Sequence, residues 1–254
     1  MKKSTINKYL YAFVGFIVLL VIWQLLSYVI CQNTFILPSP IETIKYIIYL
    51  LSKDYIYNCI GKSFSNMLKG FALSFVIAFV LGVIAGNFEK VKYSLVPFMT
   101  MIKSIPTASL VYLFLLAAGI ENAPIYIVSL VSMPILYEAI RSGIESVNEN
   151  LIDALRLDGT SLVNANIKVK IPLAWPYIAV GIDSSLALSF KIEIMAEVIT
   201  GSGKLGLGSA IASAQRSDPT NMIPIFAYSI IAIVIMYILD IVIDLFKVKA
   251  KNKI

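Results

Sequence analysis

The sequence contains no histidine and only two cysteines. Without histidine, the chain lacks the ligand sets of the usual zinc and haem sites and the side chain that most often acts as a general acid or base. The cysteines, Cys31 and Cys59, could form one disulfide, but their spacing does not require it, and two free thiols are the favoured interpretation. We therefore expect no metal site and no catalytic residue in this chain.

Charged residues are scarce, at 14% of the 254 residues, whereas 59% are hydrophobic. A soluble domain averages about 25% charged residues, and a soluble chain of this length could not bury so much apolar surface. Several apolar runs reach the ~20 residues needed to cross a bilayer. The predicted fold class is all-α: a polytopic transmembrane helical bundle that forms a single domain over residues 1–254.

Six apolar segments are predicted to span the membrane. Pro106 is expected to kink or break the third of them, because proline cannot donate the intrahelical hydrogen bond. A short amphipathic helix, from Ser39 or Pro40 to near Ser52, is too short to span and is expected to lie at the membrane interface. The spans are Tyr9–Ile30, about Met67–Gly86, Ser94–Gly119, Pro124–Tyr137 and on toward Ile140, Trp175–Thr200 and Ile223–Phe246.

The second span carries small residues at four-residue spacing, namely Ala78, Gly82 and Gly86. Such a ridge lets a neighbouring helix approach closely. General helix packing is the favoured interpretation of this pattern.

The basic residues are distributed unevenly between alternate connecting segments. Thirteen of the 21 lie in the segments that share a side with the N-terminus, and five lie in the opposite segments. Basic residues concentrate on the cytoplasmic side of membrane proteins. We therefore expect both termini, and residues 151–172, to face the cytoplasm. The net charge of +6 follows this topology pattern, and no partnership with nucleic acid is expected.

The segment Leu151–Pro172 is a long polar stretch between apolar runs. A first helix is predicted to stop at Gly159, which can adopt the left-handed conformation that closes a helix. Thr160 or Ser161 is predicted to cap a second helix that extends to about Asn166, and Pro172 is expected to turn the chain again. The pattern indicates either a rigid helical corner that docks on a partner or an ordinary surface loop.

Two glycine motifs commonly mark nucleotide-binding sites. Gly201, Gly203 and Gly206 form a GxGxxG motif, but it follows a membrane span rather than a strand, so a dinucleotide site is not expected. No GxxxxGK[ST] motif occurs. If ATP drives transport, another subunit must bind it.

The fifth span contains four ionisable residues: Asp183, Lys191, Glu193 and Glu197. Ionisable groups within a span usually face the bundle interior or a water-filled path. We predict a polar interior face for Lys191 and Glu193, although Asp183 and Glu197 lie near enough to the span ends to reach water. One functional hypothesis is a stand-alone secondary transporter that uses Lys191 and Glu193.

The spacing in the polar segment resembles the permease subunits of bacterial ABC importers. Their signature is Glu-Ala-Ala, three residues, Gly, nine residues and Ile-x-Leu-Pro. Here Asp153-Ala154-Leu155, Gly159 and Val169-Lys170-Ile171-Pro172 keep this spacing with conservative replacements. The segments LPSP (37–40), KSIPTASL (103–110), AEVI (196–199) and GLG (206–208) are similar to the nitrate/sulfonate/taurine branch.

The resemblance implies a type I importer permease with a core fold over about 60–246. Two permease chains, as a homodimer, would form the solute path in the bacterial plasma (inner) membrane lipid. Two ATPase subunits would bind ATP and Mg, so this chain holds no cofactor and is not an enzyme. An extracytoplasmic binding protein would deliver the solute, a small anion or an organic molecule such as a thiamine precursor.

The resemblance also implies roles for individual residues. The cytoplasmic segment 151–172 would couple to the ATPase through Asp153, Ala154, Gly159, Ile171 and Pro172. The translocation path would include Lys103, Pro106, Lys191, Glu193 and Glu197.

Overall fold

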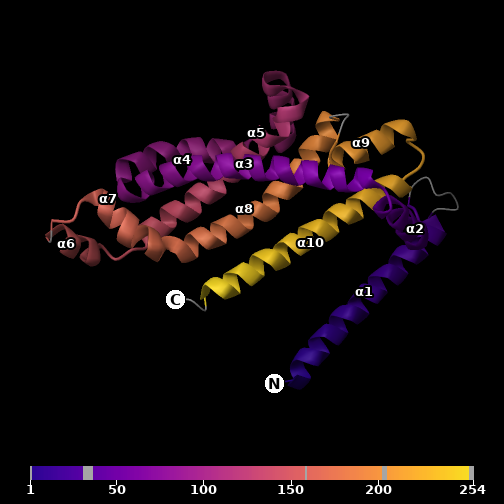
Figure 1. Cartoon of the computed structure of the whole chain (residues 1–254), viewed down its shortest axis with the longest axis horizontal. Helices are drawn as coiled ribbons and strands as arrows, with labels where there is room; N and C mark the ends of the chain where they lie inside the picture. Colours follow the sequence, from indigo (N-terminus) through magenta and orange to yellow (C-terminus); the bar gives the residue numbers. More distant parts are fainter. Residues whose placement is uncertain (1, 31–36, 158, 202–204, 252–254) are drawn as a thin grey trace.

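A computed structural model describes residues 2–30, 37–157, 159–201 and 205–251, which form helices joined by short connections (Figure 1). Within these ranges no residue is in a β-strand, and the predicted all-α class is confirmed. The elements are α1 (Lys2–Ile30), α2 (Pro40–Leu51), α3 (Asp54–Asn87), α4 (Glu89–Ser104), α5 (Thr107–Glu145), α6 (Glu149–Leu157), α7 (Leu162–Ala165), the π-helix η1 (Asn166–Lys170), α8 (Ile171–Thr200), α9 (Leu207–Ser217) and α10 (Ile223–Lys251).

Three of the described helices are long and apolar enough to cross a membrane: α3, α5 and residues Ile223–Ile243 of α10. Helix α8 is comparable in length, at 30 residues, but carries the four ionisable residues of the predicted fifth span. In α1, the apolar stretch found among the described residues is shorter, Ile17–Val29.

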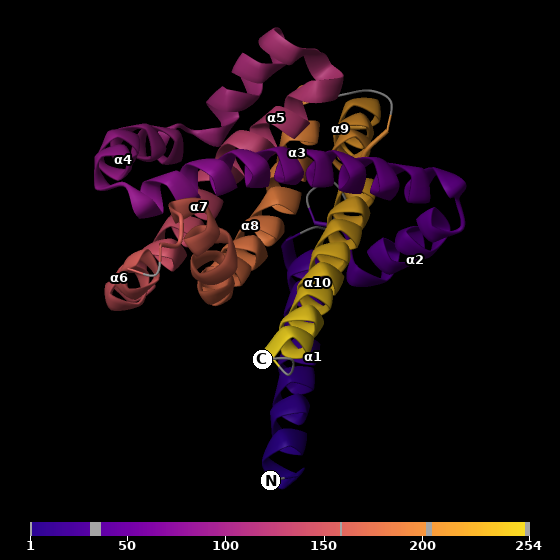
Figure 2. The same ribbon diagram turned by 60° about the vertical axis from the view of Figure 1, so that its left-hand side comes forward.

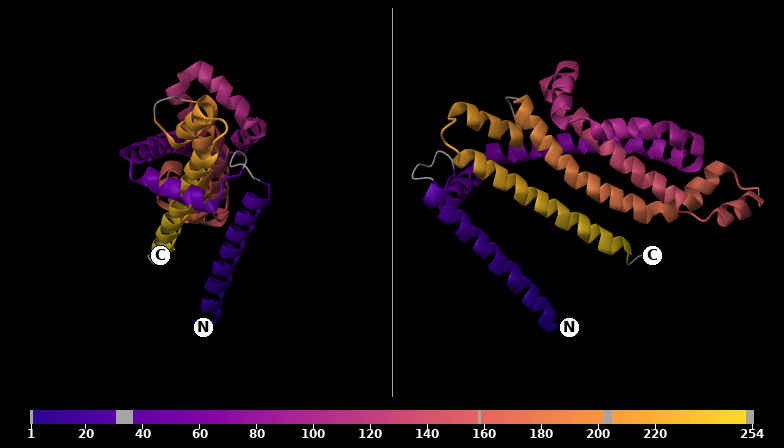
Figure 3. Two further views of the ribbon diagram at one scale, coloured as in Figure 1. Left: turned by 90° about the vertical axis from the view of Figure 1, so that its right-hand side faces the viewer. Right: turned by 180° about the vertical axis from the view of Figure 1, so that it is seen from behind.

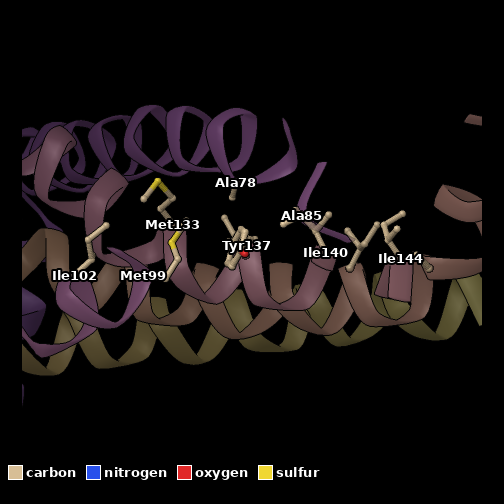
Figure 4. Packing of buried hydrophobic residues seen from close by; sticks show 11 residues of the cluster. Ala78, Ala85, Met99, Ile102, Met133, Tyr137, Ile140 and Ile144 are labelled. Atoms are coloured by element: carbon tan, nitrogen blue, oxygen red, sulfur yellow. The ribbon is translucent and has the colours of Figure 1, made fainter. Parts of the chain in front are cut away.

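Helices α3, α5 and α8 lie side by side and form the core of the bundle (Figures 1 and 2). Their shared cluster includes Ala78 and Ala85 of α3 and Tyr137, Ile140 and Ile144 of α5, which meet between the two helices (Figure 4). A Cβ atom built on Gly82 would lie 2.9 Å from Cβ of Ile140. The small-residue ridge of the second span is therefore a surface for close helix packing, as predicted.

The N-terminal helix α1 diverges from the bundle and meets it only near its C-terminal end (Figure 3). There the Trp23 Nε1–H donates to the carbonyl oxygen of Pro38 at 3.1 Å, and the Ser27 hydroxyl donates to that of Leu37 at 3.0 Å. Apolar side chains along α1 are exposed, for example Leu19 and Leu25. This exposure is what a helix surrounded by lipid requires.

Several helix boundaries confirm the sequence-based expectations. Ser39 caps α2 with a full capping box, in which its hydroxyl accepts from the Glu42 N–H and the Glu42 carboxylate accepts from the Ser39 N–H. Pro106 separates α4 from α5 and so breaks the predicted third span. Cys59 is a buried free thiol, and Cys31 lies outside the described residues.

Two boundaries differ from the prediction. Helix α3 begins at Asp54 rather than near Met67, because the polar residues before Met67 continue the same helix. The fourth span differs at its far end, because the helix continues to Glu145 instead of ending near Ile140. The predicted end of the third span near Gly119 is confirmed, since a φ of 76° and a ψ of 169° at Gly119 interrupt α5.

Replacing Gly82 by valine is expected to destabilise the protein by about 1–3 kcal/mol, because the new side chain must displace Ile140. The matched control is Gly61→Val on the same helix, since a Cβ atom at Gly61 meets nothing within 4 Å. Thermal unfolding of the purified variants measures both effects. Equal unfolding temperatures for the two variants would show that the α3–α5 contact is not close.

Candidate functional site

The polar segment after α5 forms a two-helix corner at one end of the bundle (Figure 1). Helix α6 ends at Leu157, and Gly159 follows with a φ of 76°. Ser161 then caps α7, its hydroxyl accepting from the Asn164 N–H at 3.4 Å. The predicted left-handed Gly159 and the capped second helix are confirmed, and Asp158 between the helices lies outside the described residues.

The expected turn at Pro172 is wrong. The backbone stays helical from α7 through the π-helix Asn166–Lys170 and into α8, with φ −64° and ψ −49° at Lys170. Pro172 falls in the first turn of α8. Proline is tolerated at this position, because the first turn of a helix does not need its N–H for the regular pattern. The second half of the corner is therefore continuous with a core helix.

Asn87, the last residue of α3, attaches the corner to the bundle. Its side-chain amide nitrogen donates to Oδ1 of Asn166 at 2.9 Å and to the carbonyl oxygen of Val83 at 2.7 Å. The Lys170 ammonium donates to Oδ1 of Asn87 at 2.7 Å. These bonds join the C-terminal end of α3 to the π-helix. The sequence analysis did not identify Asn87 or Asn166, because nothing in the spacing of residues 79 positions apart shows that they meet.

A polar cavity of about 340 Å³ lies beside this network. On one side, the Lys92 ammonium of α4 pairs with Oε1 of Glu145 at 3.0 Å, and the Arg141 guanidinium pairs with Glu138 and Glu145. Asp153 of α6 and Lys170 also line the cavity. Charged groups from α4, α5, α6 and η1 thus line a cavity at the base of the corner.

The corner presents a surface that we define by three apolar side chains: Leu157, Val163 and Ile167. They are 89%, 65% and 60% exposed, whereas Ile152 and Ala165 are buried and fix the corner on the bundle. Val163 and Ile167 are four residues apart and so lie on one face of a helix, and exposed apolar side chains on a polar segment indicate contact with another molecule. This surface could have been predicted from the sequence, because its members are apolar residues within a polar stretch.

The residues predicted for ATPase coupling differ in exposure. Asp153, Ala154, Gly159 and Pro172 are exposed, and Ile171 is partly buried against the core cluster of α3, α5 and α8. Four of the five positions therefore lie where a partner can reach them. Their role in coupling remains a prediction.

The residues predicted for the translocation path fall into two groups. Lys103, Pro106 and Lys191 are exposed on the surface of the chain, whereas Glu193 and Glu197 are 0% and 1% exposed. Because Lys191 and Glu193 are two residues apart on a helix, their side chains point about 160° apart. The predicted interior face shared by Lys191 and Glu193 is therefore wrong for this chain.

The buried Glu197 carboxylate of α8 joins three helices by hydrogen bonds, and we call this group of bonds the clasp. Its Oε2 accepts from the Ser63 hydroxyl of α3 at 2.7 Å and from the Gly208 N–H of α9 at 2.9 Å. The Ser63 hydroxyl oxygen in turn accepts from the Leu207 N–H at 2.9 Å. Through these hydrogen bonds Glu197 fixes the start of α9 against α8 and α3.

The family model for binding-protein-dependent transport system inner membrane components matches residues 78–252, which is more than half of the chain. The chain belongs to this family. It is therefore a membrane-embedded permease of an ABC transporter, and the resemblance seen in the sequence is confirmed. Membership does not support the alternative of a stand-alone secondary transporter.

Named relatives agree with the branch suggested by the sequence motifs. The permease is 25% identical over 207 residues to the putative aliphatic sulfonates transport permease SsuC of Bacillus subtilis, covering 81% of this chain and 74% of that protein. It is 25% identical over 246 residues to the nitrate import permease NrtB of Synechocystis, covering 92% and 84%.

The fold also matches a solved amino acid ABC transporter crystallised with histidines. The TM-score is 0.64 at 18% sequence identity, and the match covers 82% of this permease and 98% of that chain. At this identity the likeness concerns the fold alone, and it confirms the predicted type I importer permease architecture.

Ser63→Ala is expected to destabilise the permease by about 1–3 kcal/mol, because the buried Glu197 carboxylate and the Leu207 N–H each lose a hydrogen-bond partner. The control is Ser94→Ala, an exposed serine whose hydroxyl donates only to the Lys90 carbonyl oxygen, with an expected change within about 0.5 kcal/mol. Unfolding temperatures of the purified variants report the difference. A Ser63→Ala variant as stable as Ser94→Ala would contradict the clasp.

Proposed function

We propose that this permease couples ATP hydrolysis in a separate ATPase subunit to solute import through the corner formed by α6 and α7. The observation that carries the proposal is the exposed apolar surface of Leu157, Val163 and Ile167, which the remainder of the chain leaves uncovered. An ATPase cleft that covers these side chains would remove apolar area from water. Asp153 and Ala154 on α6 are also exposed.

The connection from the corner to the core explains how movement would be transmitted. Helix α7 runs through the π-helix into α8 without a break, and Asn87 ties the same junction to α3. A displacement of the corner would therefore move α8 and α3 together. Because α5 packs closely on both, the core would respond as one body, as in hinge or rigid-body transitions.

The proposed assembly contains two permease copies, two ATPase subunits and an extracytoplasmic binding protein. The distribution of basic residues supports an orientation with both termini and the corner in the cytoplasm. ATP and Mg would be bound by the ATPase, and this chain would supply the solute path and the coupling surface. The family description, which names binding-protein-dependent transport, supports the external partner.

The proposed solute is a small anion or small organic molecule of the kind that the sulfonate and nitrate relatives are named for. Lys103 and Lys191 are exposed on the single chain, so their ammonium groups are available to line a path between two copies. Glu193 and Glu197 are not available in this way, because they are enclosed between helices of one chain. An anionic solute is consistent with accessible lysine ammonium groups and enclosed glutamate carboxyl groups.

Gly159→Val is expected to abolish most solute uptake while the protein remains in the membrane. A β-branched residue is strained at a φ of 76°, by about 1–2 kcal/mol, and would relax by reorienting α6 relative to α7. The matched control is Gly159→Asn, since asparagine tolerates the left-handed region. Uptake and ATP hydrolysis are measured in proteoliposomes that contain the permease, its ATPase and its binding protein.

The expected pattern is loss of uptake with continued ATP hydrolysis in Gly159→Val and near-normal coupling in Gly159→Asn. A steric clash of the added Cβ is not involved, because no atom lies within 4 Å of its position. Normal uptake by Gly159→Val would rule out a coupling role for the corner geometry.

A cysteine at Val163 is expected to cross-link to the ATPase subunit, because this side chain is 65% exposed on the corner. The background chain carries alanine at Cys31 and Cys59. The control is Thr220→Cys, an exposed position in the connection between α9 and α10 at the opposite end of the bundle, which should be labelled from outside intact cells. Labelling of the Val163 cysteine from outside would overturn the proposed orientation.

A further inference from the structure

A second cavity, of about 270 Å³, lies at the end of the bundle opposite the corner. It is formed where α2, α3, α9 and the start of α10 come together (Figures 1 and 2). Its lining includes three tyrosines, Tyr46, Tyr55 and Tyr228, each from a different helix, together with Asp218 and Ser217. The coupling corner and the exposed lysines Lys103 and Lys191 contribute nothing to this cavity.

The lining is suited to a positive charge. Among the described residues that line the cavity, the one ionisable carboxylate is Asp218 and none is a lysine or arginine. Tyrosine rings attract cations through the negative potential of the ring face, and the lone pairs of tyrosine and serine hydroxyl oxygens face a cation favourably. The cavity therefore combines aromatic surface with acceptor oxygens and one negative charge.

Asp218 is held in its ionised form. Its Oδ1 accepts from the Thr220 hydroxyl at 2.6 Å and from the Thr220 N–H at 3.1 Å. The hydrogen bond from the Thr220 hydroxyl is the main cause that lowers the pKa of the Asp218 carboxyl below its ordinary value. A group with a lowered pKa stays charged from neutral pH down to below the usual aspartate range, so its negative charge is present under the conditions in which the permease works.

A tyrosine next to the cavity, Tyr49, already contacts a cation in this structure. The Lys53 ammonium lies 5.0 Å from the centre of the Tyr49 ring, within the range of a cation–π contact. Tyr49 packs on Tyr46 with ring centres 5.7 Å apart. Tyr46, which lines the cavity, thus belongs to the same group of packed aromatic rings.

We propose that this cavity binds a small organic cation with an ammonium group, separately from the solute path. Tyr46, Tyr55 and Tyr228 provide the ring and hydroxyl contacts, and Asp218 provides the counter-charge. The volume of about 270 Å³ is near the lower end of the range for small-molecule sites. The site requires neither the ATPase nor the coupling role of the corner, so it can be tested on the permease alone.

The test measures the binding of radiolabelled choline to the purified full-length permease in nanodiscs by equilibrium dialysis. The neutral isostere 3,3-dimethyl-1-butanol, used as a competitor, has the same shape without the charge. We expect saturable choline binding, and the isostere should compete about tenfold more weakly, since it lacks the cation–π and ionic contacts. Equal competition by the neutral isostere, or no saturable choline binding, would overturn the proposal.

Two variants test the named residues. Asp218→Asn keeps an oxygen that can accept from Thr220 but removes the charge, and it should weaken choline binding about fivefold, the size of an exposed ion pair. Tyr55→Leu removes an exposed ring and should weaken binding to a similar extent. The control is Tyr57→Leu, which also removes an exposed tyrosine from the start of α3 but does not line the cavity.

Binding by Tyr57→Leu should equal that of the unchanged protein. Thermal unfolding of all three variants shows whether each is folded, and none of the three positions is buried. If Asp218→Asn and Tyr55→Leu both bind choline as well as Tyr57→Leu does, the cavity is not the cation site. Loss of coupled transport in the complete transporter would leave this result unchanged, because the measurement does not involve the ATPase.

Discussion

The close packing of α3 on α5 is the interaction on which the rest of the structure depends. In a membrane, lipid tails are as apolar as leucine side chains, so helices associate through close van der Waals contact rather than through the hydrophobic effect. Gly82 and Gly86 place the backbone of α3 against the β-branched side chains of Ile140 and Ile144. Helices α2, α4, α9 and α10 each contact this pair or α8, which packs on α5, whereas α1 packs on α2 and α6 on α7.

Polar groups define the two ends of the packed core, since dispersion alone does not specify position along a helix. At one end, Glu197 binds the Ser63 hydroxyl and the Gly208 N–H and thereby fixes α9. At the other end, Asn87 binds Asn166 and Lys170 and thereby fixes the corner. Burying such groups is costly unless they are hydrogen-bonded, so each cluster holds its helices in one arrangement. Under the proposed coupling, a movement of the corner would therefore reach the core rather than be absorbed in a loose connection.

Local signals in the sequence were reliable where one residue controls its own backbone. The stop at Gly159, the cap at Ser161 and the break at Pro106 were each predicted from the conformational preference of a single residue. The same reasoning failed at Pro172, because the preceding π-helix lets the chain enter α8 without a turn. It also failed for Lys191 and Glu193, whose two-residue spacing puts them on nearly opposite sides of α8.

The sequence by itself determined that this chain is a helical membrane protein, where its main apolar helices lie and which segment forms the exposed corner, because these properties follow from composition, periodicity and residue-specific backbone preferences. The resemblance carried by Asp153, Gly159 and Pro172 further identified the permease family. Only the tertiary structure decided that Glu197 is a buried clasp, that Asn87 holds the corner and that tyrosines from three helices share a cavity with Asp218. These groups lie far apart in the chain, and their proximity depends on how whole helices pack.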